Sequence, residues 1–473
     1  MPINSFLYPG AKVTTGYDVA NSCRFDDGST SYLHKTPSSG GNRRTFTFST
    51  WFKRGTGFGN EQAIFTGGSN ARSAGFFTIY LTTNDRIDAH FWNGSAFDSV
   101  TPNGVLRDSS AWTHIVVAVD TTQATDSNRI KWYINGTEQT SLYSTDYPSQ
   151  NHDFNVNHTT IMQVGVRRNG SGALAGYYDG YLAETVLIDG TQLDATSFGE
   201  FDSDTNIWKP IDVSGLTFGT NGFYLDFENS SNLGADVSGN GNNFTVNNLT
   251  SVDQSIDTCT NNFATWDPNN RNTSMGSFHH GNLEYEVDAS FFRTAFATFG
   301  ADQGKWYFEC KRITGSSFSI GIISLDYKNR TSNVSYIGGA GDSTNNIGYL
   351  KDGNISIGGS ETSGYASYGN GDTVMVAMDL DNGKVYFGVN GTWGNSGDPT
   401  SGSSGTGAVS FTPSSETWTF AVSVFDSHWE ANFGSPMYSI TSGNSDGEGF
   451  GNFEYSVPSG YFSLCTKNRA EYG

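Results

Sequence analysis

Hydrophobic and polar residues alternate along two stretches of the chain that resemble each other. Residues 117–137 read VAVDTTQATDSNRIKWYINGT, and residues 376–392 read VAMDLDNGKVYFGVNGT. In both, apolar side chains recur at every second position on each side of a polar loop, which is the pattern of two half-buried strands. Both end in Asn-Gly, a pair that tolerates the positive φ of a tight hairpin turn. Because such hairpins need a sheet to bury against, the repeat predicts two β-domains of similar build.

Period-2 alternation also marks the rest of both halves. The first half contains RTFTFSTWFKR, WTHIVVAVD and GYLAETVLIDG, and the second contains GKWYFECKR, the repeat and TWTFAVSVFD. No long stretch shows the helical period of 3.6 without an interrupting glycine or Asn/Ser cluster. The sequence therefore predicts an all-β fold of two antiparallel β-sandwiches in tandem.

Length and composition divide the chain further. A chain of 473 residues is too long for one hydrophobic core, and its 58 glycines fit many strands joined by polar turns. We expect an N-terminal arm over residues 1–20, a sandwich over 21–200, an Asn/Gly-rich connector over 201–275 and a second sandwich over 276–473.

The formal net charge of −21 bears on partners. An acidic surface repels phosphate backbones and anionic lipids, so we expect no nucleic-acid binding and no membrane insertion. Acidic loops are also able to hold Ca²⁺, although negative charge ordinarily serves solubility. The N-terminus MPINSFLYPGAKVTTGYD has no basic stretch before an apolar run, so we expect no signal peptide. Four widely spaced cysteines predict free thiols: Cys23, Cys259, Cys310 and Cys465.

Two known families share the order of these motifs. FTFSTWFKR, WTHIVVAVD, WYINGT and GYLAETVLIDG occur in the order typical of a laminin G-like domain, a member of the concanavalin A-like jelly-roll group. GKWYFECKR, FSIGII, the second hairpin, TWTFAVSVFD and EANFG resemble a SPRY domain. The connector and the tail VPSGYFSLCTKN are similar to segments of bacteriophage virion proteins, although Cys259 stands where that connector more often has proline.

The resemblance implies a structural protein on the surface of a bacteriophage particle. It would be a tail fibre or spike-like appendage that binds a host glycan or another virion protein, without catalysis. One alternative is a capsid decoration or head-fibre protein with a purely architectural role, and another is a polysaccharide-degrading glycosidase of the virion. Such proteins fold in the host cytoplasm before assembly into the virion, and the family expectation is a homo-oligomer, often a trimer.

A retaining glycosidase requires two carboxyl groups about 5 Å apart, which a strand can supply as Glu-x-Asp-x-Glu on one face. That motif is absent. In NLEYEVDAS, Glu284, Glu286 and Asp288 share one face of a strand, and we interpret them as a solvated edge. Glu184 in GYLAETVLID has no second acid at a fixed spacing, so we expect a structural role. The sequence predicts no enzyme.

Binding residues are sought among loop aromatics, because a ring face suits the apolar face of a sugar. For each of them, packing in the core or at a subunit contact is the alternative. Two acids near loop ends of the first sandwich, Asp120 and Asp179, are candidates for a Ca²⁺ site, and no other cofactor is expected. The candidate binding residues are Trp393, His428, Trp429, Tyr327 and Trp92.

Overall fold

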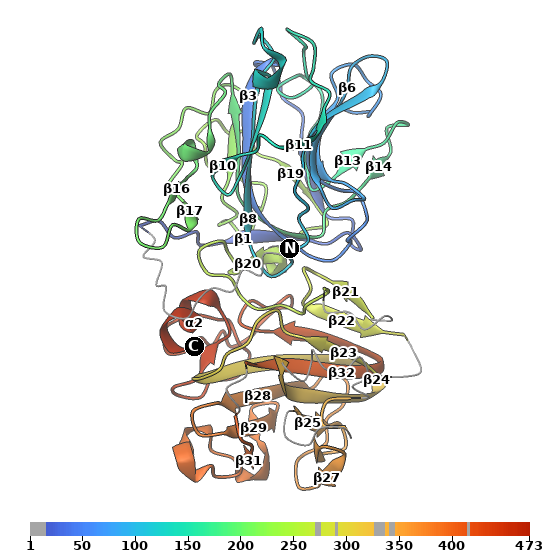
Figure 1. The fold of residues 1–473 in the computed structure, drawn as a ribbon. Helices are drawn as coiled ribbons and strands as arrows, with labels where there is room; N and C mark the ends of the chain where they lie inside the picture. Colours follow the sequence, from blue (N-terminus) through green and yellow to red (C-terminus); the bar gives the residue numbers. More distant parts are fainter. Residues whose placement is uncertain (1–15, 270–275, 289–291, 326–335, 340–345, 414–416) are drawn as a thin grey trace. The chain divides into compact units, whose positions relative to one another are not determined.

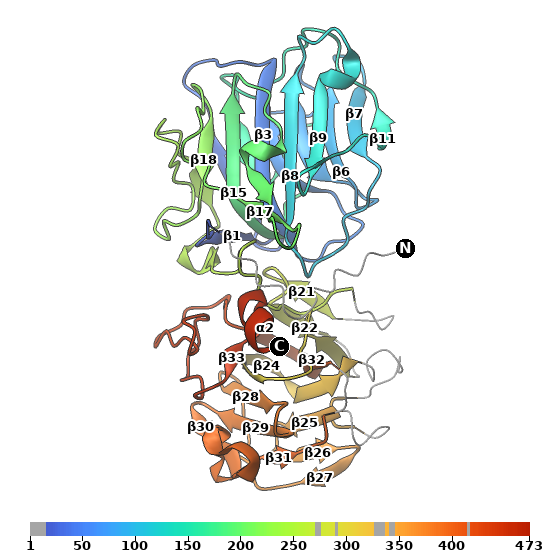
Figure 2. The ribbon, with the colours of Figure 1, turned by 60° about the vertical axis from the view of Figure 1, so that its left-hand side comes forward.

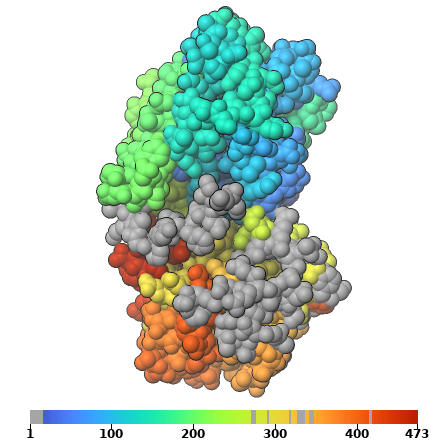
Figure 3. Space-filling view, in the orientation of Figure 1, coloured from blue at the N-terminus to red at the C-terminus, as the bar shows by residue number. Residues whose placement is uncertain are grey.

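The structure is a computed structural model that describes residues 16–269, 276–288, 292–325, 336–339, 346–413 and 417–473, without the side chains of 316–318. The chain divides into two compact units (Figure 1; Figure 3). The first runs to Thr260, and the second begins at Asn261. Pairing between strands is antiparallel throughout the described residues, except for one short parallel pair in the second unit. None of the described helices has the length and hydropathy needed to cross a membrane.

Two sheets of eight strands face each other in the first unit (Figure 2). Sheet A has the order β10-β9-β8-β3-β15-β1-β20, with β18 also on β15, and sheet B has the order β11-β7-β6-β5-β4-β12-β2-β19. The strands are β1 (Ser22–Phe25), β2 (Tyr32–Lys35), β3 (Thr45–Arg54), β4 (Gln62–Gly67), β5 (Phe77–Leu81), β6 (Ile87–Trp92), β7 (Phe97–Pro102), β8 (Thr113–Asp120), β9 (Ile130–Ile134), β10 (Thr137–Glu138), β11 (Leu142–Thr145), β12 (Met162–Val164), β15 (Gly180–Asp189), β18 (Phe223–Leu225), β19 (Thr245–Asn247) and β20 (Gln254–Ser255). Two small hairpins lie outside these sheets: β13 (Arg167–Arg168) with β14 (Leu174–Ala175), and β16 (Gly199–Phe201) with β17 (Trp208–Pro210).

Alternation along the strands builds the core of this unit. Phe46, Phe48 and Phe52 of β3 are buried together with Ile115, Val117 and Val119 of β8 and the inward residues of sheet B. Burying every second side chain removes apolar surface from water on one face of each sheet, at about 25 cal/mol per Å². In sheet B, the side chains that alternate with these core residues point away from the core and are able to contact other groups.

The second unit is built around two long strands, β24 (Lys305–Ser324) and β32 (Trp418–Asn432), which pair over most of their length. The first half of β24 pairs with β28, and its second half pairs with β25, so one strand serves two parts of the sheet. The others are β21 (Ser277–His279), β22 (Glu284–Val287), β23 (Arg293–Phe296), β25 (Asn346–Leu350), β26 (Ile355–Ile357), β27 (Ser360–Thr362), β28 (Thr373–Asp379), β29 (Lys384–Val389), β30 (Thr392–Trp393), β31 (Val409–Ser410) and β33 (Phe462–Ser463), followed by the helix α2 (Thr466–Tyr472).

Both copies of the sequence repeat form the predicted hairpin. Strands β8 and β9 hold the first, and β28 and β29 hold the second. The turn residues Asn135 and Asn390 have φ of 46° and 48°, as the Asn-Gly pair requires. Each asparagine also accepts a hydrogen bond at its side-chain oxygen, from the backbone N–H of His114 (2.8 Å) and of Thr373 (2.9 Å) respectively. The all-β fold of antiparallel sandwiches predicted from the sequence is confirmed.

The domain limits differ from those expected. Residues 201–275 are not a separate connector, because β18 adds to sheet A through β15, β19 adds to sheet B through β2, and β20 pairs with β1. Beyond Thr260 the chain belongs to the second unit, where Phe263 bridges to Cys465. Of the expected N-terminal arm, only residues 16–20 are described, and the backbone N–H of Val19 bonds to Thr260 Oγ1. Short pairing segments with little alternation explain why this part looked like a linker.

Candidate functional site

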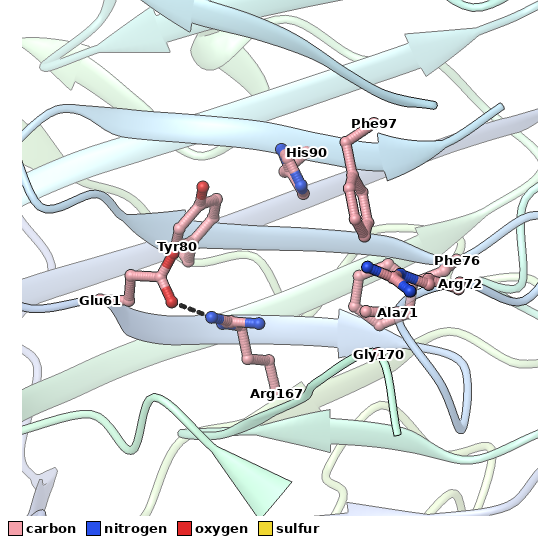
Figure 4. Close-up of a pocket in the computed structure, with 9 residues that line it drawn as sticks. All are labelled: Glu61, Ala71, Arg72, Phe76, Tyr80, His90, Phe97, Arg167 and Gly170. Carbon is pink, nitrogen blue, oxygen red and sulfur yellow. Dashed lines mark hydrogen bonds and ion pairs between the residues drawn. The ribbon is translucent and has the colours of Figure 1, made fainter. Parts of the chain in front are cut away.

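A pocket of about 270 Å³ lies on the face of sheet B that is turned away from the core (Figure 4). The register of β5, β6 and β7 brings three lining residues together: Tyr80 pairs with Asp88, two residues before His90, and Phe97 pairs with Trp92, two residues after it. The core takes the alternate residues, so Tyr80 and His90 project outward. The lining residues are Glu61, Ala71, Arg72, Phe76, Tyr80, His90, Phe97, Arg167 and Gly170.

Aromatic rings form one side of the pocket. The rings of His90 and Phe97 stack with centroids 4.7 Å apart, and Tyr80 meets His90 edge-on at 5.5 Å. Trp92 packs edge-on against Phe97 at 4.8 Å. Phe97 is 39% exposed, which is unusual for a phenylalanine that already has two ring partners. This cluster therefore presents an open aromatic surface held in place by its neighbours.

Charged groups form the opposite side. The Arg167 guanidinium pairs with the Glu61 carboxylate and lies 5.7 Å from the centre of the Tyr80 ring. Burial lowers the pKa of Arg167. Behind the rings, the Asp88 carboxylate accepts a hydrogen bond from Thr101 Oγ1 (2.8 Å) and lies 3.5 Å from His90 Nδ1. The pocket thus combines ring faces with a few polar groups, which is the composition of a site for a small polar ligand.

Three of the predicted binding residues lie in three different parts of the chain, and the two that the structure describes do not line the pocket. Trp92 lies beside the pocket through its contact with Phe97, without lining it. Trp393 lies on β30 in the second unit, half-buried, with its ring 6.4 Å from that of Tyr307. Tyr327 lies outside the described residues.

The other two predicted binding residues were assigned to the wrong kind of element. His428 and Trp429 belong to the long strand β32 and not to a loop. Trp429 is fully buried in the core of the second unit, so its ring has no face for a ligand. His428 Nε2 lies 2.8 Å from Glu284 Oε1, and the histidine side chain is 21% exposed. The polar residues of FDSHWEAN suggested a loop, whereas they belong to a strand, in which Asp426, His428 and Glu430 are partly or fully exposed.

Asp179, one of the two predicted metal ligands, does lie in an acidic cluster. Its carboxylate and those of Asp26 and Asp27 have oxygen atoms within 4.8 Å of one another. These residues meet because β1 and β15 pair and end together. Backbone N–H groups already bind two of the three carboxylates, since Ser29 donates to Asp26 and Thr56 donates to Asp179. The spacing would suit one Ca²⁺ ion.

Asp120, the other predicted metal ligand, is not part of that cluster. Its carboxylate accepts hydrogen bonds from the Thr122 hydroxyl (2.6 Å) and the Gln123 side-chain amide (2.6 Å). Burial acts to raise the pKa of Asp120, but these bonds outweigh it, so the pKa is lowered. The residue shapes the end of β8.

Glu184 sits at a bulge in β15, where its φ is 49° and the pairing with β3 shifts. The side chain is buried, and its Oε2 accepts hydrogen bonds from Tyr224 (2.7 Å) and Tyr17 (3.1 Å). Burial raises its pKa to about 7. The bulge turns Glu184 away from the strict alternation with Leu182 and Val186 that the sequence suggested.

Glu284 is not on a solvated edge, contrary to expectation. Strand β22 pairs with β21 on one side and β32 on the other, so it is an interior strand. Glu284 is buried, and its two oxygens lie 2.8 Å from His428 Nε2 and 3.4 Å from His280 Nε2. The hydrogen bond to Glu284 raises the pKa of His428. Of the other two acids on this face, Glu286 is partly exposed and Asp288 is exposed.

The residues that line the pocket were not singled out from the sequence. The sequence did indicate two of them, in GFFTIYL and RIDAHFW. Tyr80 and His90 occupy outward positions of alternating strands, and such positions ordinarily hold small polar residues. Arg72 and Arg167 carried no local signal, because the loop after β4 and the hairpin at β13 meet only in the folded unit.

A family model matches part of the first unit. Residues 27–191 match the family described as the concanavalin A-like lectin/glucanases superfamily. No curated protein matches the chain closely enough to count as a relative. Domains LG4-5 of the mouse laminin alpha1 chain are 10% identical, over 91% of this chain and 93% of that chain, with a TM-score of 0.29.

Two further solved structures are similar to parts of the chain. A putative carbohydrate binding protein from Bacteroides ovatus is 14% identical over 50% of this chain and 60% of that chain, with a TM-score of 0.33. The SPRY domain of human HERC1 is 11% identical over 32% of this chain and 87% of that chain, with a TM-score of 0.26. Scores this low say nothing of function. The family match and the paired sheets together identify residues 27–191 as a concanavalin A-like domain of the laminin G type.

Proposed function

We propose that this protein is a lectin-like binding protein without catalysis, and that its first unit binds a glycan in the pocket on sheet B. The observation that carries the proposal is the ring cluster of Tyr80, His90 and Phe97, which leaves Phe97 39% exposed beside a charged wall. Sugar rings have an apolar face that packs on aromatic rings and hydroxyls that bond to charged side chains. The pocket supplies both kinds of partner.

The rival activity is glycan hydrolysis, which needs two carboxyl groups on either side of the scissile bond. Among the lining residues, Glu61 is the one that carries a carboxylate, and Arg167 engages it. The pocket therefore favours binding. Assaying new reducing ends after incubation with host polysaccharide distinguishes the two, and steady release that Glu61→Gln abolishes would establish a hydrolase.

A glycan array tests the binding directly. We expect signals from a subset of bacterial surface glycans, with affinity lowered about five-fold in Phe97→Ala, since an aromatic contact contributes ~1 kcal/mol beyond area burial. Phe201→Ala, at an exposed phenylalanine of the same unit that does not line the pocket, is the matched control and should bind as the wild type does. Absence of binding to every glycan, or equal binding by Phe97→Ala, would refute the site.

For the biological setting, we propose the surface of a bacteriophage particle, where the chain would act as a tail fibre or spike-like appendage attached to other virion proteins. The order of laminin G-like and SPRY-like motifs and the phage-like tail VPSGYFSLCTKN support this setting. The four cysteines are free thiols, which suits assembly in a reducing host cytoplasm. Capsid decoration is the alternative location. Antibody labelling of purified particles decides between tail and capsid, and labelling of neither would exclude both.

A further inference from the structure

Two guanidinium groups line the pocket, and they differ in their surroundings. Arg167 is paired with Glu61 and packs over the Tyr80 ring. Arg72 is exposed at the opposite end, below Phe97 (Figure 4), and within the described part of the chain no carboxylate forms an ion pair with it. In a chain of net charge −21, an exposed cation without a carboxylate partner stands out at this position.

The backbone around Arg72 is held in place by hydrogen bonds. Asn70 Oδ1 accepts from the Arg72 backbone N–H (2.7 Å), and the N–H of Ala71 donates to the carbonyl of Asn169 (3.1 Å). A Cβ at Gly170 would lie 3.1 Å from Arg72 Nε, so the glycine lets the side chain lie close against that loop. The loop after β4 and the hairpin at β13 thus jointly position one free guanidinium at the rim of an aromatic pocket.

We propose that the pocket is specific for an acidic sugar, a uronic acid residue whose carboxylate binds the Arg72 guanidinium while its ring packs on Phe97. The proposal rests on the glycan binding proposed above and names the class of sugar. A guanidinium presents two parallel N–H groups that match a carboxylate, and such charge-assisted pairs are stronger than neutral hydrogen bonds. The Arg167 guanidinium is less available to a sugar carboxylate, because it already pairs with the carboxylate of Glu61.

The pocket can be probed with a matched pair of ligands. Oligogalacturonide carries a carboxylate on every sugar, and its fully methyl-esterified form has the same rings without charge. By isothermal titration calorimetry at low salt, we expect the acidic form to bind about ten-fold more tightly to the wild-type chain, as a charge-assisted bond of about 1.4 kcal/mol predicts. Raised salt should reduce this preference.

Three variants make the test specific. Arg72→Gln should lose the ten-fold preference while keeping its affinity for the ester, and Arg72→Lys should retain part of it, because lysine keeps the charge but not the planar fork. Lys131→Gln removes a positive charge from sheet A, where Lys131 pairs with Glu138, and should leave the preference intact.

The outcomes separate the two proposals. Equal binding of acid and ester that Phe97→Ala weakens would leave the glycan site standing and overturn its acidic specificity. A preference for the acid that Lys131→Gln reduces as much as Arg72→Gln does would reflect overall charge, which also overturns it. Tighter binding of a sulfated sugar than of the uronic acid would reject the carboxylate as the group recognised. If neither form binds, the specificity for a uronic acid is overturned, and the glycan array alone decides whether the site binds another sugar.

Discussion

Replacing Glu184 by glutamine should stabilise the first unit at alkaline pH. Burial raises the pKa of Glu184 from its ordinary value of 4.5 to about 7 in the folded chain. The folded state therefore holds this proton over a range where the unfolded state has lost it. The stability linked to the proton is fully present below pH 4.5 and is lost as pH rises through 7.

The size of the effect follows from the shift. A rise from 4.5 to about 7 corresponds to roughly 3 kcal/mol at ~1.4 kcal/mol per pKa unit. Both tyrosine hydroxyls donate to the same oxygen, Oε2, so the amide oxygen of glutamine can accept both bonds. Glu184→Gln should thus match the wild type near pH 5 and exceed it near pH 8 by that amount, or ~6–12 °C in melting temperature for a unit of this size.

Differential scanning calorimetry from pH 5 to pH 9 provides the measurement. Glu138→Gln, at an exposed carboxylate of the same unit that is not among the groups that shift the pKa of Glu184, is the control and should leave the pH dependence of the wild type unchanged. Parallel pH profiles for Glu184→Gln and the wild type would refute the reasoning. So would a variant less stable than the wild type at pH 8.

Four further predictions concern other parts of the chain. Trp429→Ala should destabilise the second unit by about 3–5 kcal/mol in urea denaturation, because it opens a cavity in the core; a change below ~1 kcal/mol would place the ring at the surface. Asn390→Ala should cost about 2 kcal/mol in the same assay, since alanine loses both the positive φ and the side-chain bond, whereas Asn390→Gly should cost less. Glu284→Gln should lower the pKa of His428 toward 6.5 in an NMR titration, and an unchanged pKa would show that their hydrogen bond is absent. In the acidic cluster of Asp26, Asp27 and Asp179, two carboxylates already accept hydrogen bonds from the backbone, so a chelator should move the melting midpoint of the protein by less than about 1 °C. A stabilisation by Ca²⁺ that Asp27→Asn removes would instead establish a metal site.

The local sequence pattern explains which strands could be predicted from the sequence and which could not. The mixture of aromatic and charged residues in FDSHWEAN is typical of a loop, yet β32 continues through them because its partner β24 is longer still. The Asn/Gly-rich stretch after residue 200 looked like a linker, because β18, β19 and β20 have only two or three residues each. Such short strands form only where neighbouring strands of the folded sheets supply their hydrogen bonds.

The sequence by itself determined the strands and the two hairpin turns, because alternation and the φ of Asn135 and Asn390 are local properties of the chain. Only the tertiary structure decided the candidate site. Tyr80, His90 and Phe97 come from three strands, whereas Arg72 lies in the loop after β4 and Arg167 lies on β13, almost a hundred residues further along the chain. Their meeting depends on the pairing and register of distant strands, which a local pattern does not encode.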